Sequence, residues 1–246
     1  MNRRVVAGMA TYPPRYSIAL SSVQSIARQV DCLYLYVNDD GERPPWIRDL
    51  PENVRPVLGS KMCGDLQDAG KFWGTRREED AIYLSCDDDL LYPEDYASHL
   101  TGCIEELAGQ AACGYHGCIV TEESMKGTYR SAQRYKQHFR KLLSLPQRAN
   151  VLGTGVMGVD LQAVSISLDE MGERPHADLH VARQLQEQEK ACVILPHNER
   201  WIKRTPAFES VPHLHEKHLN ERAPAWARNY PWTLYQSDES HLHRLA

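Results

Sequence analysis

Several features that would assign a protein to a class at once are missing from this 246-residue chain. Its seven cysteines form no CxxC pair, and an odd, dispersed set favours reduced thiols in a cytoplasmic protein. No apolar run approaches the roughly 18 residues that span a bilayer, so we expect neither a transmembrane segment nor secretion. The net charge is −5, which excludes a general attraction to nucleic acid and leaves a phosphorylated small molecule as the simpler partner.

The most informative feature is a run of three adjacent aspartates, Asp87, Asp88 and Asp89, which follows an apolar segment. Carboxylates so close together raise one another's pKa unless a cation offsets them. An all-oxygen cluster suits Mg²⁺ or Mn²⁺, which take their remaining ligands from water and substrate phosphates. The run therefore predicts a divalent-cation site for a diphosphate-bearing substrate. The alternative is a solvated acidic turn that caps a helix over residues 93–107.

The hydrophobic pattern predicts alternating strands and helices, which is typical of one α/β domain. The predicted strands cover residues 4–9, 32–37, 54–58, 81–86, 111–120, 151–159 and 192–195. The predicted helices cover residues 18–30, 66–79, 93–107 and 178–190. The aspartates and the turn Asn38-Asp39-Asp40 both follow strands, so we expect them at the carboxyl edge of the sheet, where such folds bind ligands. A catalytic domain over 1–205 would carry a C-terminal extension over 206–246.

A basic and aromatic segment over residues 126–148 is predicted to be a loop with a helix. It contains Lys126, Arg130, Arg134, Lys136, Arg140, Lys141 and Arg148, together with Tyr129, Tyr135 and Phe139. One interpretation is an active-site lid that meets phosphates or an anionic acceptor. The other is an ordinary solvated helix face.

Four separated segments together resemble the GT-A glycosyltransferases of the family 2 type. They are residues 5–15, the pair Asn38-Asp39, the aspartate run, which resembles the DxD motif, and Gly155 with the later Asp178. The resemblance implies a Rossmann-like open twisted mixed sheet flanked by helices. It also implies a metal-dependent enzyme of polysaccharide biosynthesis that moves a sugar from a nucleotide-sugar, by default a UDP-sugar, to a carbohydrate acceptor. Peripheral association with a polysaccharide-assembly complex is compatible with that role.

The resemblance also assigns roles to the metal site. Asp89 is expected to bind Mn²⁺ or Mg²⁺ directly, Asp87 to contact the ribose or the metal through water, and Asp88 to assist the donor sugar. Alternation along an extended chain would place Asp87 and Asp89 on one side. His197, directly after a predicted strand and Pro196, resembles the late histidine that completes the metal site, although it could equally be a loop histidine without a ligand.

Inverting members of this fold need a carboxylate base, and Asp178 is the candidate. It also suits a helix N-cap, and Ala177 stands where the family commonly has a second acidic residue. The resemblance further predicts a set of residues that contact the nucleotide or the donor: Thr11, Tyr12, Arg15, Asn38, Asp39, Lys71 and Gly155.

Three other patterns keep alternatives open. Residues 153–158 match GxGxxG, with Asp178 about 20 residues further on, as a dinucleotide site of an NAD(P)-dependent oxidoreductase would require. The histidines of residues 213–218 and 241–243 could bind zinc, but their spacing fits no closed structural site. The aromatic tail residues Trp226, Tyr230, Trp232 and Tyr235 could stack on sugars or anchor the tail. A scaffold that binds a nucleotide-sugar without turnover is a further alternative.

Overall fold

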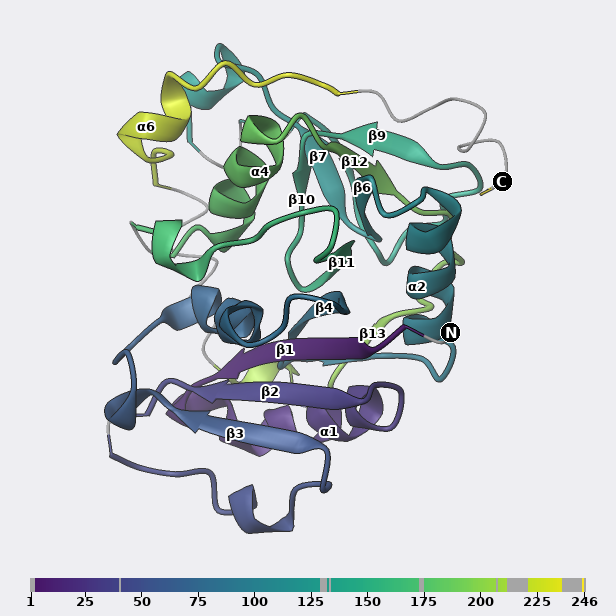
Figure 1. The fold of residues 1–246 in the computed structure, drawn as a ribbon. Coiled ribbons are helices and arrows are strands. Elements are labelled where there is room, and N and C mark those ends of the chain that lie inside the picture. Colours follow the sequence, from purple (N-terminus) through teal and green to yellow (C-terminus); the bar gives the residue numbers. More distant parts are fainter. Residues whose placement is uncertain are drawn as a thin grey trace.

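An eight-stranded mixed sheet forms the centre of the protein, with strand order β3-β2-β1-β4-β11-β6-β12-β9 (Figure 1). The computed structural model describes residues 3–39, 41–128, 132, 134–172, 175–206, 208–211, 221–235 and 245. The strands of this sheet are β1 (Val5–Thr11), β2 (Cys32–Val37), β3 (Val54–Leu58), β4 (Ile82–Asp87), β6 (Ala111–Gly114), β9 (Gln147–Ala149), β11 (Val156–Asp160) and β12 (Ala191–Ile194). The α/β class expected from the sequence is confirmed.

The first four strands of the sheet run parallel, and one strand beside them runs the other way. β1 pairs in parallel with β2 and β4, and β2 pairs in parallel with β3. β11 is antiparallel to both β4 and β6, while β12 is parallel to β6. The sheet is therefore mixed, and β1, β4, β6 and β12 all end at the same edge.

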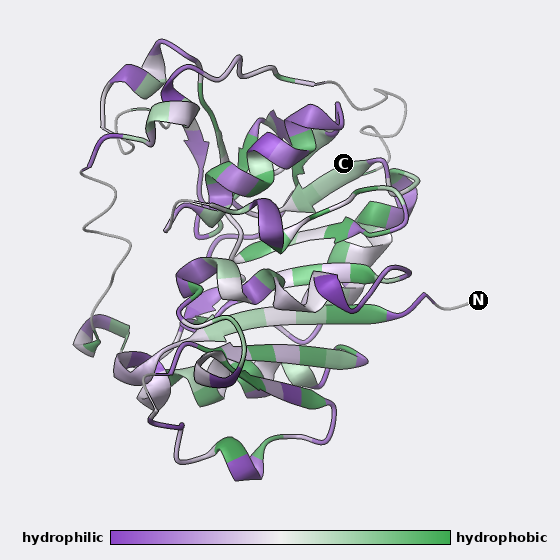
Figure 2. Ribbon diagram, turned by 60° about the vertical axis from the view of Figure 1, so that its left-hand side comes forward, coloured by the Kyte–Doolittle hydropathy of each residue, from purple (hydrophilic) through white to green (hydrophobic). Residues whose placement is uncertain are grey.

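Helices cover both faces of the sheet because the strands alternate their side chains between two apolar layers. Ala7 and Met9 of β1 pack against α1 (Tyr16–Ala27) and α2 (Tyr96–Glu106). Val6, between them in the sequence, points to the opposite face. That face is covered by the 3₁₀ helix η4 (Gln67–Arg76) and by α4 (Ala177–Glu187). Figure 2 shows the apolar strands lying between more polar helices.

The order of the strands creates a switch point between β1 and β4. From β1 the chain moves outward to β2 and β3, and it then returns to β4 on the other side of β1. The connections that leave β1 and β4 therefore lead in opposite directions along the sheet, and the crevice in which open α/β sheets bind ligands is expected at the carboxyl ends of two such strands. Ala10 of β1 lies opposite Asp87 of β4 in the register. The aspartate run thus lies where open α/β sheets bind ligands.

Short turns divide two of the predicted strands. Residues 111–120 form β6 and then β7 (Gly117–Ile119), which turns away into a small sheet with β10 (Val151–Leu152) and β8 (Arg134–Gln137). Residues 151–159 likewise form β10 and β11, separated by a turn over 153–155. The predicted helix over 66–79 is a 3₁₀ helix rather than an α-helix. The other predicted strands and helices are confirmed with small shifts of their ends.

The described part of the basic segment adopts strands, β8 and β9, and the 3₁₀ turn η5 (Ser124–Lys126). Tyr129 and Arg130, and the histidines considered for zinc, lie outside the described residues. In the tail, α6 (Ala225–Arg228) packs on α4: the ring of Trp226 lies 4.9 Å from that of His180. Trp226 therefore anchors the tail. All cysteines are free thiols, as the sequence predicts, and Cys86, Cys113, Cys118 and Cys192 are buried.

A glycine in β1 lets η4 approach the sheet closely, and this contact can be tested. A methyl group at Gly8 would lie 1.9 Å from the carbonyl oxygen of Lys71 and 2.1 Å from the hydroxyl of Tyr83. We expect Gly8→Ala to lower the free energy of unfolding by about 2–3 kcal/mol, because backbone must move to admit the methyl group. Chemical denaturation followed by tryptophan fluorescence measures this change.

The matched control is Gly102→Ala in α2, where the methyl group meets no heavy atom of the described residues within 4 Å. That variant should gain about 0.5–1 kcal/mol from helix propensity. An unchanged stability for Gly8→Ala would contradict the close approach.

Candidate functional site

The three aspartates lie where β4 ends and the chain turns. Asp87 is the last residue of β4, and Asp88 and Asp89 form the turn before the two-residue strand β5 (Leu90–Leu91). The helix α2 begins only at Tyr96, with Asp95 at its N-cap position. The interpretation of the run as a helix-capping turn is therefore wrong. Because the strand stops at Asp87, strict alternation of the three side chains does not hold either.

Arg15 neutralises two of the three carboxylates. Its guanidinium lies 2.6 Å from Asp88 Oδ1 and 3.0 Å from Asp89 Oδ2. Pro13 and Pro14 favour the 3₁₀ turn η1 (Pro13–Arg15) at the end of β1, and this turn carries Arg15 to the neighbouring β4. Burial lowers the pKa of Arg15, but the charges of Asp88 and Asp89 outweigh burial and raise it above its ordinary value. The cation is therefore permanent.

Lys71 neutralises the third carboxylate from the opposite side. Its ammonium group is buried and forms an ion pair with Asp87 Oδ1. Burial alone lowers the pKa of Lys71, but the charges of Asp87 and then Asp68 raise it above its ordinary value. The backbone of Lys71 is fixed by Tyr83, whose hydroxyl donates a hydrogen bond of 2.7 Å to its carbonyl oxygen. A strand residue thus positions the lysine of η4.

The carboxylate of Asp89 is poorly stabilised despite its partner. Burial first, and then the charge of Asp87, raise the pKa of Asp89 to about 7, against the opposing effect of Arg15. Burial also raises the pKa of Asp88, again against Arg15. Asp88 Oδ2 is buried and accepts no hydrogen bond from the described residues. Burial is the first cause of the raised pKa at both residues, and the three carboxylates of the run share two cations, Arg15 and Lys71.

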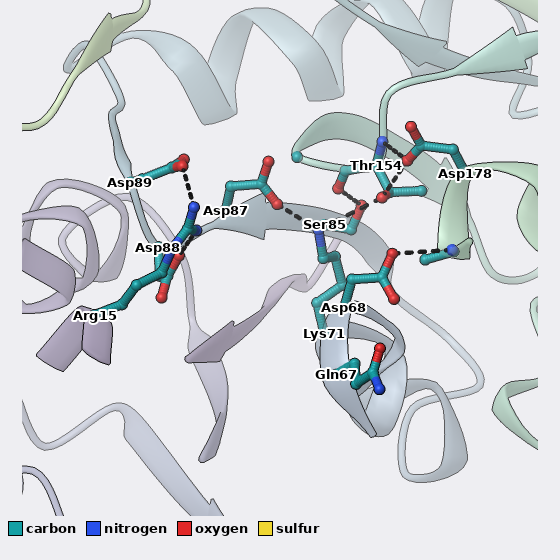
Figure 3. A network of polar contacts seen from close by, with 12 residues as sticks. Arg15, Gln67, Asp68, Lys71, Ser85, Asp87, Asp88, Asp89, Thr154 and Asp178 are labelled. Carbon is teal, nitrogen blue, oxygen red and sulfur yellow. Dashed lines mark hydrogen bonds and ion pairs between the residues drawn. The ribbon is translucent and has the colours of Figure 1, made fainter. Parts of the chain in front are cut away.

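A line of polar contacts connects the aspartate run with Asp178 (Figure 3). The ammonium group of Lys71 lies 3.5 Å from Thr154 Oγ1. Thr154 donates two hydrogen bonds to Asp178 Oδ1, of 2.9 Å from its backbone nitrogen and 2.6 Å from its hydroxyl. Asp178 lies in the first turn of α4, where the helix dipole favours a carboxylate. These contacts bring Asp87 and Asp178 to the two ends of one line.

Gly155 is needed beside Asp87 for steric reasons. A methyl group at Gly155 would lie 1.9 Å from Asp87 Oδ2. Tyr92 also fixes this corner: its hydroxyl accepts a hydrogen bond of 2.6 Å from the backbone nitrogen of Asp87 and donates one of 2.7 Å to the carbonyl oxygen of Gly155. The lack of a side chain at Gly155 therefore makes room for the carboxylate of Asp87.

The other residues predicted to hold the nucleotide lie around the same crevice, but one is already engaged. Asn38 Nδ2 donates to the carbonyl oxygen of Gln67, and Asn38 Oδ1 accepts from the backbone nitrogen of Leu66. Its side chain therefore clamps the start of η4. Asp39 is partly exposed, and although burial opposes it, hydrogen bonds from Ser60 hold the pKa of Asp39 below its ordinary value.

Two further predicted nucleotide contacts lie on the connection that leaves β1. Thr11, the last residue of β1, is buried. Tyr12 is partly exposed, and its ring lies 5.7 Å from the guanidinium carbon of Arg15. Tyr12 therefore lies beside Arg15 and is partly open to solvent, whereas Thr11 is not.

His197 lies apart from the aspartate run. It follows β12, which is three strands away from β4 in the sheet, or about 14 Å at the usual strand spacing. Its Nδ1 lies 2.8 Å from the carbonyl oxygen of Leu195, and its ring packs edge-on against Tyr115. Within the described residues, no three side chains of the metal-binding types gather into a site. The structure thus brings Asp87 and Asp89 together but does not add His197 to them, and its ligand role stays a prediction.

Some residues of this network were not predicted from the sequence. Thr154 joins Lys71 to Asp178, Ser85 donates a hydrogen bond to the carbonyl oxygen of Thr154, and Asp68 accepts a hydrogen bond of 3.0 Å from the backbone of Ala177. Burial raises the pKa of Asp68, although Lys71 opposes the shift. A threonine between two glycines carries no charge or periodicity, so only the fold shows its role.

No known protein family matches the chain, and neither does any curated protein. Over the described residues, none of the helices is long and apolar enough to cross a membrane.

The raised pKa of Asp89 predicts a pH dependence of stability. Between pH about 4 and 7 the folded state binds more protons than the unfolded chain, so the free energy of unfolding falls as the pH rises through this window. Asp89→Asn removes the charge. At pH 8 and without metal, this variant should be more stable than the wild type by about 1–3 kcal/mol, since the lost ion pair with Arg15 offsets part of the gain.

Urea denaturation at pH 8 and pH 5 measures the effect. The difference in the free energy of unfolding between Asp89→Asn and the wild type should be smaller at pH 5. The control is Asp49→Asn, at an exposed position, which should show no such gap. A variant less stable than the wild type at pH 8 would contradict the charge shortage around Asp89.

Proposed function

We propose that the protein is a metal-dependent glycosyltransferase that moves a sugar from a nucleotide-diphosphate donor, by default a UDP-sugar, to a carbohydrate acceptor. The observation that carries the proposal is the buried aspartate run at the switch point of the sheet, joined by Lys71 and Thr154 to Asp178. Ligands of open α/β sheets bind at this place. The run supplies the groups for a diphosphate and its cation, and Asp178 supplies a carboxylate for an acceptor.

The residues fit a divalent cation. Asp87 and Asp89 supply carboxylate oxygens at the end of β4, and with Asp88 they share two cations, Arg15 and Lys71, among the described residues. Mg²⁺ and Mn²⁺ usually bind through one or two carboxylates, with water and substrate phosphates completing the shell. Asp87 and Asp89 would therefore suffice as protein ligands of the ion, and His197 stays a predicted third ligand. When bound, the ion would act as a Lewis acid on the leaving diphosphate.

Arg15 and Lys71 fit a role with the donor phosphates. Both are cations that the sheet edge holds next to the proposed ion. Their present partners are the aspartates, so a bound cation would release part of that pairing and leave positive charge for the diphosphate. The two-pronged guanidinium of Arg15 suits bidentate contact with phosphate oxygens, whereas Lys71 supplies a point charge.

Two features support Asp178 as the general base. Two hydrogen bonds from Thr154 orient one of its oxygens, and the side chain is only partly buried. A base must reach the acceptor hydroxyl before its pKa matters, and an oriented carboxylate beside the crevice meets that requirement. Loss of the acceptor proton to Asp178 would allow attack on the sugar from the side opposite the diphosphate, with inversion.

The dinucleotide alternative is less well supported. The fingerprint requires a strand, then the glycine turn, then a helix whose N-terminus meets the pyrophosphate. Here the turn over residues 153–155 leads into the strand β11, which contains Gly158. A scaffold that binds the donor without turnover uses the same crevice, so it is separated from the enzyme by product formation.

Donor binding is tested by calorimetry with UDP and Mn²⁺. We expect metal-dependent binding that Asp89→Ala weakens by roughly 100-fold, the effect of losing about 2.8 kcal/mol of contacts. Asp49→Ala serves as the exposed control and should bind as the wild type does. NAD binding without metal, or UDP binding that Asp89→Ala leaves unchanged, would overturn the donor site.

The role of Asp178 is tested separately from donor binding. Asp178→Asn keeps the hydrogen-bonded shape but removes the base, so transfer should fall by about 10²–10⁴-fold while UDP affinity stays the same. Transfer is followed by UDP release with a panel of acceptors. Retained transfer in the variant would remove Asp178 from the mechanism, and donor binding without any transfer in the wild type would favour the scaffold.

A further inference from the structure

Two of the most exposed large apolar side chains of the described chain lie on one loop. Leu142 and Leu145 are 59% and 62% exposed, and both belong to residues 138–146, the connection between β8 and β9, which we call the leucine loop. Single exposed leucines are common on protein surfaces. Two that lie three residues apart on one short connection are less usual and call for an explanation.

The backbone of the leucine loop is held in place, so the exposure is built into the fold. Lys141 donates a backbone hydrogen bond of 2.8 Å to the carbonyl oxygen of His138, which closes a turn. Leu143, between the two exposed leucines, is buried and pairs with His197 in both directions, at 3.0 Å and 2.9 Å. Leu142, next to this buried residue, is consequently directed outward, and Leu145 lies in the exposed stretch that leads to β9.

Basic side chains surround the loop. Four of them act together on the half-buried ring of His138, and we call them the basic rim: Lys136, Arg140, Lys141 and Arg204. Burial and then these cations lower the pKa of His138 to about 4, so the ring itself is neutral at physiological pH. Arg200 joins the rim through a backbone hydrogen bond of 3.3 Å to the carbonyl oxygen of Arg140.

The basic rim is positively charged, whereas the whole chain has a net charge of −5. Among the described residues, Glu209 lies 3.3 Å from Arg204, and Glu199 lies 3.7 Å from Arg200. Both glutamates are themselves exposed. The leucine loop of an acidic protein thus carries basic side chains, Arg140 and Lys141, directly before its exposed leucines.

The combination identifies the occupant by its chemistry. Cations at a membrane surface are attracted by anionic headgroups, and apolar side chains between them enter the boundary of the acyl chains. A nucleic acid would satisfy the cations but would give the leucines nothing. We propose that the leucine loop and its basic rim dock the protein on the surface of a bilayer that contains anionic lipid. This inference stands on the loop alone and does not rest on the proposed sugar transfer.

The test is flotation of the full-length protein with vesicles. One set contains phosphatidylcholine alone, and the other contains about one third phosphatidylglycerol. We expect binding to the anionic vesicles, weak binding to the neutral ones, and release as the salt concentration rises. In Leu142→Ser with Leu145→Ser, binding to anionic vesicles should weaken at least about tenfold, because the apolar contact is lost. Arg140→Gln with Lys141→Gln should weaken it by roughly tenfold as well.

Matched controls separate the loop from general surface properties. Met62 is 59% exposed, as Leu142 is, and follows the exposed Lys61. Both come after β3, which is the edge strand of the sheet opposite β9. Met62→Ser with Lys61→Gln should bind vesicles as the wild type does. All substituted side chains are exposed, and circular dichroism confirms that each variant is folded.

Three results would overturn the proposal. The first is a wild-type protein that does not float with anionic vesicles. The second is binding that the leucine and rim variants leave unchanged or that the control variant weakens equally. The third is binding to an oligonucleotide instead of to vesicles, which would assign the basic rim to nucleic acid.

Discussion

The repulsion between three adjacent carboxylates is the constraint on which the rest of the candidate site depends. Two unit charges 4 Å apart repel each other by about 4 kcal/mol near a protein surface, so a run of three at the end of a buried strand requires cations from elsewhere in the chain. Arg15 comes from the end of β1 and Lys71 from η4. Each must be brought to β4 by the packing of the sheet, and Gly8 permits the second approach. The arrangement of the first half of the chain is thus tied to the neutralisation of its aspartates.

Arg15 and Lys71 do not balance all the negative charge of the site. This excess negative charge explains why we propose that a divalent cation and a diphosphate bind there together. Asp68 and Asp178 also act on Lys71, so acidic groups outnumber the cations around the crevice. A diphosphate alone would meet net negative charge there. A divalent cation alone would meet two carboxylates already engaged with cations. If both bind, the metal ion balances the carboxylates, and Arg15 and Lys71 become available to the phosphates. Binding of the metal ion would therefore strengthen binding of the diphosphate, and the reverse. Such reciprocity follows from linkage.

The sequence predicted local features well and long-range contacts poorly. The bounds of β2 and β3 follow from their apolar pattern, and the aspartate run could be placed at a strand end because Tyr83 and Leu84 precede it. The pairing of Lys71 with Asp87 was not predictable, since it depends on how closely η4 approaches β1. The hydrogen bond between Thr154 and Asp178 joins residues 24 positions apart across a strand and a loop. The glycines around Thr154 suggested a dinucleotide turn, but Gly155 leaves room for Asp87 and Gly153 lies against His116.

One backbone segment joins the two regions for which we propose functions. His197 pairs with Leu143 of the leucine loop, and residues further along the same segment form β13 (Lys203–Arg204), which pairs with β5. Directly after β13, the backbone nitrogen of Thr205 donates a hydrogen bond of 2.9 Å to the carbonyl oxygen of Asp89. A surface that held the leucine loop would therefore also fix the orientation of the aspartate run. If both proposals hold, this geometry suits an acceptor presented at a membrane surface better than one that diffuses freely, because the carboxyl edge of the sheet would then meet the acceptor in a constant orientation.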